Sequence, residues 1–431
     1  MNHPGPLLLA HGVGSQHDLP ISPFYAFAGA FAALFVSFLA LGLLWSTSRF
    51  RGDRSGLALP AAVQRAADAP AVRLVLRGYG LAAALFVVLH LVLGPDDPDR
   101  NPAAGSVYVL FWVGLVPASL LLGPVWRLLN PLRTVHRLIQ YALHRAVPGA
   151  VHKERSPLGL RPAAGGLFAF TWLELAAPEP ASRTTLLVFL GCYTVLQLAA
   201  AARYGEGWFA RGDAFEVYST LIARLSPWGR RRDGRLVLRN ALHGLDATEP
   251  TPGLVAVVCV MLGSTAYDGF SDAPSWISTV QTSPLGRTTT ATLGLCGAIA
   301  LVAALYALCA GATRLLGRAE HPLVDFAHSL VPIALGYLVA HYFTLLTTEG
   351  PRTLALAAGS EHPVAPEPPL SPGGLAVLQV VAIVTGHVLG VVAAHDRSVR
   401  LFPPSKAVAG QLPMLALMIA YTLGGLTLLI A

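Results

Sequence analysis

Residues 24–46 read FYAFAGAFAALFVSFLALGLLWS, and residues 47–54, directly after them, read TSRFRGDR. The first stretch contains no charged residue over 23 positions, which is long enough to cross the hydrocarbon core of a bilayer as one helix. The second stretch places three arginines beside it. Membrane insertion selects such a pattern, because short loops rich in Lys and Arg stay on the cytoplasmic side.

The same pattern repeats along the 431 residues. Mean hydropathy is +0.57 and only 12% of the residues are charged, whereas about a quarter of a soluble domain is charged. We therefore expect an all-α, polytopic membrane helix bundle, a single membrane domain over residues 1–431. Its ten expected spans are residues 24–46, 75–94, 106–125, 163–178, 185–202, 253–269, 289–313, 323–347, 374–395 and 411–430.

The basic residues indicate an orientation. Of the 30 Lys and Arg residues, 26 fall in every second gap between spans, and the exceptions are Arg100, Arg183, Arg287 and Arg352. The basic gaps are then cytoplasmic and both termini are extracytoplasmic, with the first span as an uncleaved anchor. The net charge of +7 is explained by this orientation and by contact with anionic lipid, so we predict a lipid bilayer as partner and no nucleic acid. Arg far outnumbers Lys, which favours a bacterium of high GC content and hence its inner (cell) membrane.

Two basic cytoplasmic loops, residues 126–162 and 203–252, are long enough to carry interfacial helices. In the first, Asn130-Pro131 predicts a helix start and Pro148-Gly149 its end. The arginines of this helix, Arg133 and Arg137, form a polar stripe that we expect to face the lipid headgroups.

The second loop contains Asp213 three residues before Glu216, which resembles a capping box, followed by apolar residues at helical spacing. We expect an interfacial helix here too. On the other side of the membrane, residues 348–373 are rich in Pro and small residues, which predicts a flexible tether.

Ionisable side chains inside apolar spans are costly and are the default functional candidates. The predicted topology places His90, Glu174, Asp268 and His341 toward the outer ends of their helices. The N-terminal segment, residues 1–23, adds His11 and Asp18, because its glycines allow it to fold back over the bundle. Imidazoles and carboxylates at one level suit a divalent transition metal (Zn²⁺, Cu²⁺, Fe²⁺ or Ni²⁺), and the predicted metal ligands are His11, His90, Asp268 and His341. Alternatively, each polar group satisfies a neighbouring helix or a loop carbonyl.

A second group lies toward the inner ends. Asp325 and His328 are three residues apart and share a helix face. Pro332 removes the amide that would bond the His328 carbonyl, which predicts a kink and a free acceptor. His387 lies in Gly386-x-x-x-Gly390, which favours a tight helix contact with a hydrogen bond across it. His328 and His341 are separated by about 20 Å along a helix axis and cannot share one metal ion, but Asp325, His328 and His387 suit a path for ions or protons.

Several motifs resemble those of a group of actinobacterial membrane proteins labelled fenitrothion hydrolase, and the resemblance covers nearly the whole chain. The motifs are His11–Gly14, Asp18–Pro20, Tyr267–Phe270, His341-Tyr342, Gly386-His387, His395–Arg397 and Gln411–Leu415. The resemblance implies hydrolysis of an organophosphate triester, an apolar small-molecule substrate that enters from the bilayer. A metal-bound hydroxide suits that reaction, with the four ligands above holding the metal and Asp18 as a catalytic base or an outer carboxylate.

Three other functions fit the same residues. One is membrane transport or the handling of metal ions or protons along the intramembrane His and Asp residues, gated by kinked helices. Another is a non-catalytic membrane subunit whose basic loops bind a cytoplasmic partner. Haem ligation by the intramembrane histidines ranks last.

Overall fold

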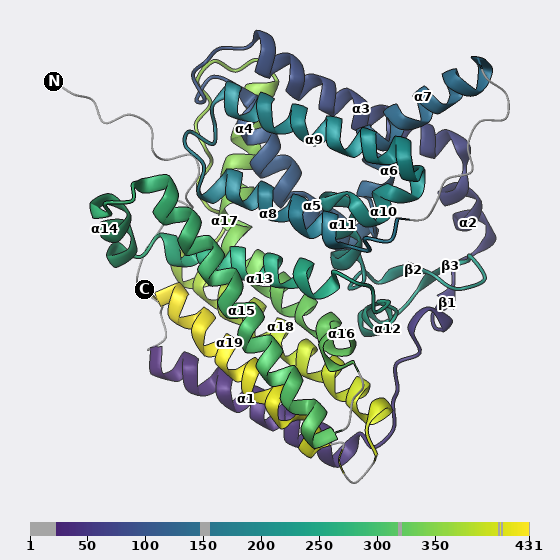
Figure 1. Cartoon of the computed structure of the whole chain (residues 1–431), viewed down its shortest axis with the longest axis vertical. Coiled ribbons are helices and arrows are strands. Elements are labelled where there is room, and N and C mark those ends of the chain that lie inside the picture. The colour runs from purple at the N-terminus through teal and green to yellow at the C-terminus, as the bar shows by residue number, and fades with distance from the viewer. Residues whose placement is uncertain (1–22, 147–155, 318–320, 404–405, 407, 431) are drawn as a thin grey trace.

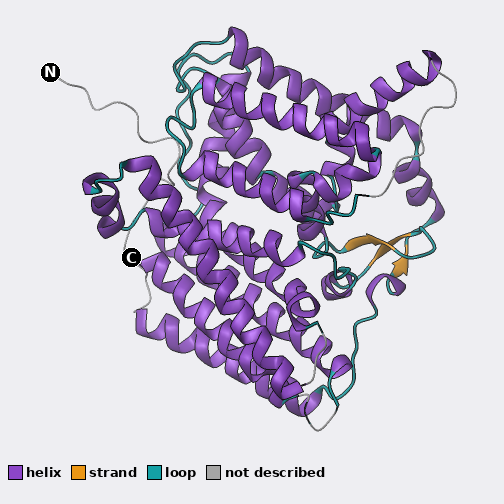
Figure 2. Cartoon of the chain, in the orientation of Figure 1, coloured by secondary structure: helices purple, strands orange, loops and turns teal. Residues whose placement is uncertain are grey.

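The computed structural model describes residues 23–146, 156–317, 321–403, 406 and 408–430. Helices form nearly all of its regular structure, and three short strands form one small sheet (Figure 2). Within the described residues, nine helical segments are long and apolar enough to cross a membrane. The predicted all-α helical bundle is confirmed at this level.

Nine of the ten expected spans correspond to these segments. They are α1 (Pro23–Leu44), α3 (Pro70–Leu93), α4–η2–α5 (Pro102–Gly105, Ser106–Val113 and Leu115–Leu122), α9 (Arg183–Tyr204), α13 (Leu254–Ser271), α15 (Arg287–Gly317), α16–η4–α17 (Pro322–Phe326, Ala327–Leu330 and Val331–Ala357), α18 (Pro372–Leu401) and η5–α19 (Ala409–Gln411 and Leu412–Ile430).

The remaining expected span, residues 163–178, is α8 (Arg161–Leu175), which has 15 residues. At 1.5 Å per residue this helix is about 22 Å long, shorter than the hydrocarbon core of about 30 Å. Seven of its side chains are buried, so α8 belongs to the interior of the bundle.

The outward surface of the bundle is apolar. α3 buries only Gly80 and Leu91, and Leu74 on its surface is 71% exposed. α9 likewise leaves Leu196 69% exposed. Apolar surface of this extent is rare on soluble monomers and is solvated by lipid in a membrane protein.

The helices form two layers (Figure 1). α3, α8 and α9 lie in one layer, and α1, α15, α18 and α19 lie in the other. α13 and α17 lie between them, since α13 contacts α8 and α15, and α17 contacts η2 and α18. Side chains from α13 and α17 are therefore placed to meet at the centre of the molecule.

The two ends of the bundle differ. At one end, here called the sheet end, lie η1 (Gly52–Arg54), α2 (Ala61–Asp68), α12 (Ala241–Asp246) and the antiparallel sheet of order β1-β3-β2 (Figure 1). Its strands are β1 (Leu57–Ala58), β2 (Trp228–Arg230) and β3 (Leu236–Leu238). The opposite end carries α14 (Pro274–Thr282) and is here called the α14 end.

The helix predicted in the first basic loop is α7 (Pro131–Ala146), which follows the short α6 (Trp126–Leu129). It begins as predicted, since Asn130 Oδ1 accepts the backbone N–H groups of Leu132 and Arg133 at 3.0 and 3.2 Å. The predicted orientation is wrong for Arg133, which is buried and bridges Glu206 and Glu216 at 2.6 Å each. Two protein carboxylates satisfy the guanidinium in place of lipid headgroups.

The second basic loop contains η3 (Glu206–Trp208), α10 (Phe209–Gly212) and α11 (Ala214–Ala223). Asp213 caps α11 as predicted, accepting the N–H of Glu216 at 2.7 Å. The interfacial location is wrong, because nearly every residue of α11 is buried and the helix packs against α5 and α8. Phe215 and Tyr218 of α11 both belong to the core. A helix that is apolar on most of its circumference is more stable inside than on a surface.

The tether predicted over residues 348–373 is wrong for its first ten residues, since α17 continues through Pro351 to Ala357. Arg352 pairs with Glu349 one turn earlier and with Asp99 in the loop after α3, at 3.0 Å each. These ion pairs hold the helical extension against that loop.

Candidate functional site

A carboxylate and an imidazole meet in the interior of the bundle. Asp268, in the last turn of α13, lies with its Oδ2 2.8 Å from Nε2 of His341 on α17. The hydroxyl of Tyr342 donates to the same oxygen at 2.7 Å. Asp268 is buried. The structure thus brings together two of the four predicted metal ligands.

Three more side chains surround this pair. Glu174 of α8 lies close enough to Asp268 for the two carboxylates to interact electrostatically, and it also lies within range of Tyr218 of α11. The ring of Tyr218 stacks on that of Trp112 of η2, with centroids 4.5 Å apart. We define the central polar cluster as Trp112, Glu174, Tyr218, Asp268, His341 and Tyr342.

The cluster contains unsatisfied polar atoms. Oε2 of Glu174 and the hydroxyl of Tyr218 are buried and have no hydrogen-bond partner among the described residues. Each such atom costs about 1–3 kcal/mol. A hydroxyl donor and a carboxylate oxygen within electrostatic range of each other are groups that a bound ion, a water molecule or a polar ligand would satisfy.

The pairing with Asp268 determines what His341 can do. An Nε2–H that donates to Asp268 leaves the lone pair on Nδ1, and the side chain is 21% exposed. Such an imidazole can accept a proton or bind a metal ion through Nδ1. The exposed Asp272, at the C-terminal cap of α13, lies within electrostatic range of His341. The central polar cluster therefore extends from the surface near α14 into the core.

Of the other two predicted metal ligands, only His90 lies within the described residues. His90 is bonded through Nδ1 to the Phe86 carbonyl of its own helix at 2.9 Å, and its ring packs on that of Phe86. In the part of the chain that the structure describes, no three His, Cys, Asp or Glu side chains form a group that could hold a metal ion. His11 and the predicted catalytic Asp18 lie outside the described residues.

His328 lies where the helix changes character. η4 is a 3₁₀ turn between α16, which contains Asp325, and α17. The predicted free acceptor is wrong, because the Val331 N–H donates to the His328 carbonyl, as the tighter 3₁₀ geometry allows. The predicted kink takes the form of this turn, and His328 is buried within it.

The close contact predicted at Gly386 and Gly390 is present. A Cβ atom placed on Gly386 would lie 2.5 Å from the Pro332 carbonyl oxygen, and one on Gly390 would lie 2.8 Å from that of Ser329. His387 is fully buried there, but its Nδ1 bonds to the Ile383 carbonyl of its own helix at 2.9 Å. Its Nε2 has no partner among the described residues, so the predicted bond across the contact is absent.

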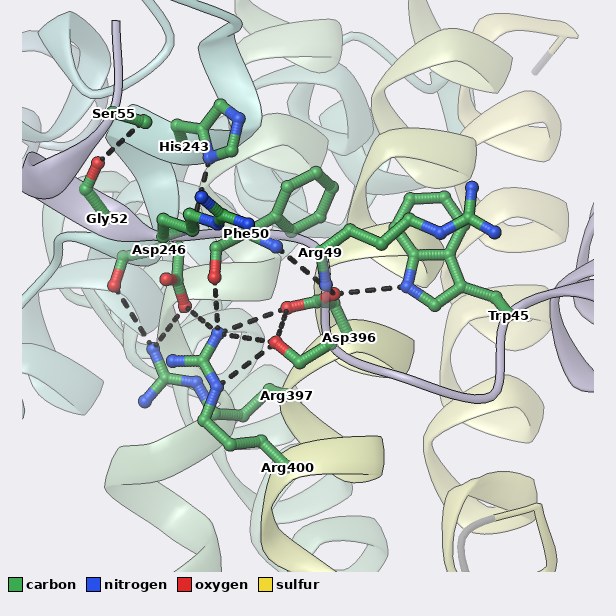
Figure 3. A network of polar contacts seen from close by, with 12 residues as sticks. Trp45, Arg49, Phe50, Gly52, Ser55, His243, Asp246, Asp396, Arg397 and Arg400 are labelled. Atoms are coloured by element: carbon green, nitrogen blue, oxygen red, sulfur yellow. Dashed lines mark hydrogen bonds and ion pairs between the residues drawn. The ribbon is translucent and has the colours of Figure 1, made fainter.

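The motif His395–Arg397 anchors the sheet end (Figure 3). Asp396 is buried between the loop after α1 and the end of α18. Its carboxylate accepts from Trp45 Nε1 at 3.1 Å, Ser48 Oγ at 2.8 Å, Arg49 N at 2.6 Å and Arg400 at 3.1 Å. These bonds join the loop after α1 to the end of α18.

Sequence reasoning missed Trp112 and Tyr218 as parts of a polar site and did not assign a role to Tyr342. Each carries one polar atom on a large apolar ring, so each counts as an apolar span residue. Of these three residues, only Tyr342 could have been identified from the sequence, because it directly follows the candidate ligand His341.

An all-helical bundle with an apolar outer surface and a buried polar cluster defines the class of multi-pass membrane proteins. No protein-family model, curated protein or solved structure matches this chain.

Proposed function

We propose that the protein binds and passes on a cation, either a proton or a metal ion, at the central polar cluster. The observation that carries this proposal is the proximity of two buried carboxyl groups, Glu174 and Asp268, with His341 as their one basic neighbour in the cluster. Like charges repel strongly where the dielectric constant is low. A bound positive charge offsets this repulsion, so a cation is the ligand that the cluster would hold most tightly.

Further polar residues along α17 and α18 support a path rather than an isolated site. Tyr337 lies between His328 and His341 in sequence, and its ring contacts that of His387, with centroids 5.7 Å apart. The three histidines therefore occupy successive levels along the α17–α18 contact. Together with Asp325 they form the proposed ion or proton path, and the 3₁₀ break at η4 is typical of transporter helices.

The charge distribution supports an orientation. The loops that hold most of the Lys and Arg residues adjoin the sheet end, so this end faces the cytoplasm of a bacterial inner membrane in our proposal. The central polar cluster then opens through His341 toward the extracytoplasmic side.

The test is cation flux into proteoliposomes, with an internal pH dye for protons and separate assays for monovalent and divalent metal ions. We expect flux in the wild type and a loss of at least about tenfold, about 1.4 kcal/mol in barrier height, in Asp268→Asn and Glu174→Gln. Asp97→Asn in an exposed loop is the matched control. Flux no greater than that of protein-free liposomes for every cation would contradict the proposal.

The open Nδ1 of His341 favours metal-dependent hydrolysis as a second candidate. A carboxylate behind a ligating imidazole, as Asp268 lies behind His341, is typical of metal sites. The N-terminal segment would supply His11 as a further ligand and Asp18 as a base, and the substrate class would be an apolar phosphotriester. Metal analysis of purified wild type, His341→Ala and His11→Ala tests this candidate, which is lost if the wild type contains no stoichiometric transition metal.

A further inference from the structure

The Arg239 side chain is held between two glycines at the sheet end. A Cβ atom placed on Gly229 of β2 would lie 2.3 Å from Arg239 Cζ, and one placed on Gly244 of α12 would lie 2.6 Å from its Nη2. Both distances are far below van der Waals contact. The guanidinium therefore fills space that a side chain at either position would occupy.

No carboxylate is bound directly to this guanidinium in the part of the chain that the structure describes. Arg239 forms no hydrogen bond or ion pair with another described residue, and its Nε is buried. Arg224, after α11, also lacks such a bond, and the two arginines lie close enough to repel each other. Burial lowers the pKa of both groups, and Arg224 lowers that of Arg239 further. Asp53 and Glu249 are the carboxylates within electrostatic range, and Asp53 is bound to Arg232 at 2.8 Å.

The neighbouring arginines of the sheet end differ from Arg224 and Arg239 because each of them forms an ion pair with a carboxylate. Arg230 pairs with Asp68, Arg231 with Asp233, and Arg397 and Arg400 with Asp246. Two adjacent, partly buried guanidinium groups with no carboxylate bound to them among the described residues are costly unless an anion joins them. Their fork of N–H donors matches the tetrahedral oxygens of a phosphate group.

We infer that Arg224 and Arg239 form a binding site for a phosphate group at the sheet end. The phosphate belongs either to a soluble phosphate compound or to a lipid headgroup. The small sheet offers a surface for the lipid case, because Leu57, Leu238 and Trp228 are register partners across its three strands and all are exposed. An aromatic and aliphatic row beside arginines is typical of a membrane interface.

The experiment measures thermal unfolding of the full chain under two comparisons. Detergent-solubilised protein is compared in inorganic phosphate and in chloride at equal ionic strength, and nanodisc-embedded protein is compared in phosphatidylglycerol and in phosphatidylcholine. Because a ligand of the folded state raises its stability, we expect Tm to rise by about 2–4 °C with inorganic phosphate or with phosphatidylglycerol. A rise with phosphate identifies a soluble ligand, and a rise with phosphatidylglycerol alone identifies a headgroup.

The variants are Arg239→Gln and Arg224→Gln, with Arg232→Gln on the exposed hairpin as the matched control. We expect the two test variants to lose the Tm shift and the control to keep it. In anion-free detergent Arg224→Gln is expected to raise Tm, because it removes a repulsion, whereas loss of a merely structural arginine would lower it. If Arg239→Gln does not fold, Gly229→Ala takes its place, because the three atoms nearest to the added Cβ all belong to the Arg239 guanidinium, which the methyl group would displace. A shift that persists in both test variants, or no shift in the wild type with either ligand, overturns the inference.

Discussion

His341 and the buried Asp268 form an imidazole–carboxylate pair, with Nε2 2.8 Å from Oδ2. Because Asp268 belongs to α13 and His341 to α17, the pair joins the two helices that lie between the layers of the bundle. The Tyr342 hydroxyl donates to the same carboxylate oxygen. The pair therefore combines a structural contact with the acid–base chemistry proposed for the central polar cluster.

Tyr342→Phe removes one donor to Asp268 and keeps the ring. We expect unfolding stability in detergent to fall by about 1–2 kcal/mol, because the buried carboxylate loses a hydrogen bond, and cation flux to fall less than in Asp268→Asn. Tyr337→Phe, which loses a hydroxyl bonded to the Tyr421 carbonyl, is the control for stability alone. Wild-type stability and flux in Tyr342→Phe would show that the hydroxyl does not act on Asp268.

Glu174→Gln separates function from folding. Among the described residues the buried Glu174 Oε2 atom has no hydrogen-bond partner, so a neutral amide of the same size is expected to leave the free energy of unfolding unchanged or slightly higher. Flux is expected to be lost, since one of the two carboxylates is gone. Denaturant unfolding and flux measured on one preparation check both parts. A large loss of stability with flux retained would refute the functional assignment.

Arg133→Met tests the buried ion pairs of α7. Since Glu216 would remain buried without its partner, we expect a destabilisation of about 3–5 kcal/mol. Arg137→Met is the control, because Arg137 is 35% exposed and also pairs with Glu206, and a pair of this kind contributes about 0–1 kcal/mol. The double variant Arg133→Met with Glu216→Met should recover most of the loss. Equal losses of unfolding free energy in Arg133→Met and Arg137→Met would contradict the expectation that the buried ion pair stabilises the fold more than the exposed one.

The buried carboxyl group of Asp213 is expected to make the stability of the protein depend on pH. Burial is the largest cause that raises the pKa of this carboxyl group from 3.8 to about 7, although the N–H of Glu216 opposes the shift. The folded state thus binds the proton more tightly than the unfolded state, so its contribution to stability is complete below about pH 4 and is lost as the pH rises through about 7.

The matching variant is Asp213→Asn, which keeps a side-chain oxygen for the cap of α11 and cannot ionise. We expect wild-type Tm to fall between about pH 5 and pH 8, and the variant's Tm to fall less. Parallel Tm curves for the two proteins over this range would rule out the assigned role.

Local features of the chain were predictable from the sequence. Hydropathy and length identify nine of the spans, because a bilayer imposes both. The caps at Asn130 and Asp213 follow from the hydrogen-bonding needs of helix ends, and the contact at Gly386 follows from the small size of glycine.

Features that depend on helix order were not predictable. Sequence places His90 and His341 at one level of the membrane, but the described structure bonds His90 within its own helix. The burial of Arg133 depends on Glu206 and Glu216, more than 70 residues away along the chain. The burial of α11 depends on its packing against α5 and α8. Likewise, Trp112 and Tyr218 become members of a polar site only because η2 and α11 pack beside α8 and α17.

The most direct test of the central polar cluster is infrared difference spectroscopy of its carboxyl groups. Metal-free protein is compared before and after addition of each metal ion, in the wild type, Glu174→Gln and Asp268→Asn. If the cation is a proton, our proposal predicts that the wild type without metal shows the band of a protonated carboxyl group. If it is a metal ion, the proposal predicts that this ion shifts the carboxylate bands. In either case the band or the shift is expected to be lost in Glu174→Gln. Two ionised carboxylates with no proton and no response to any cation would contradict it.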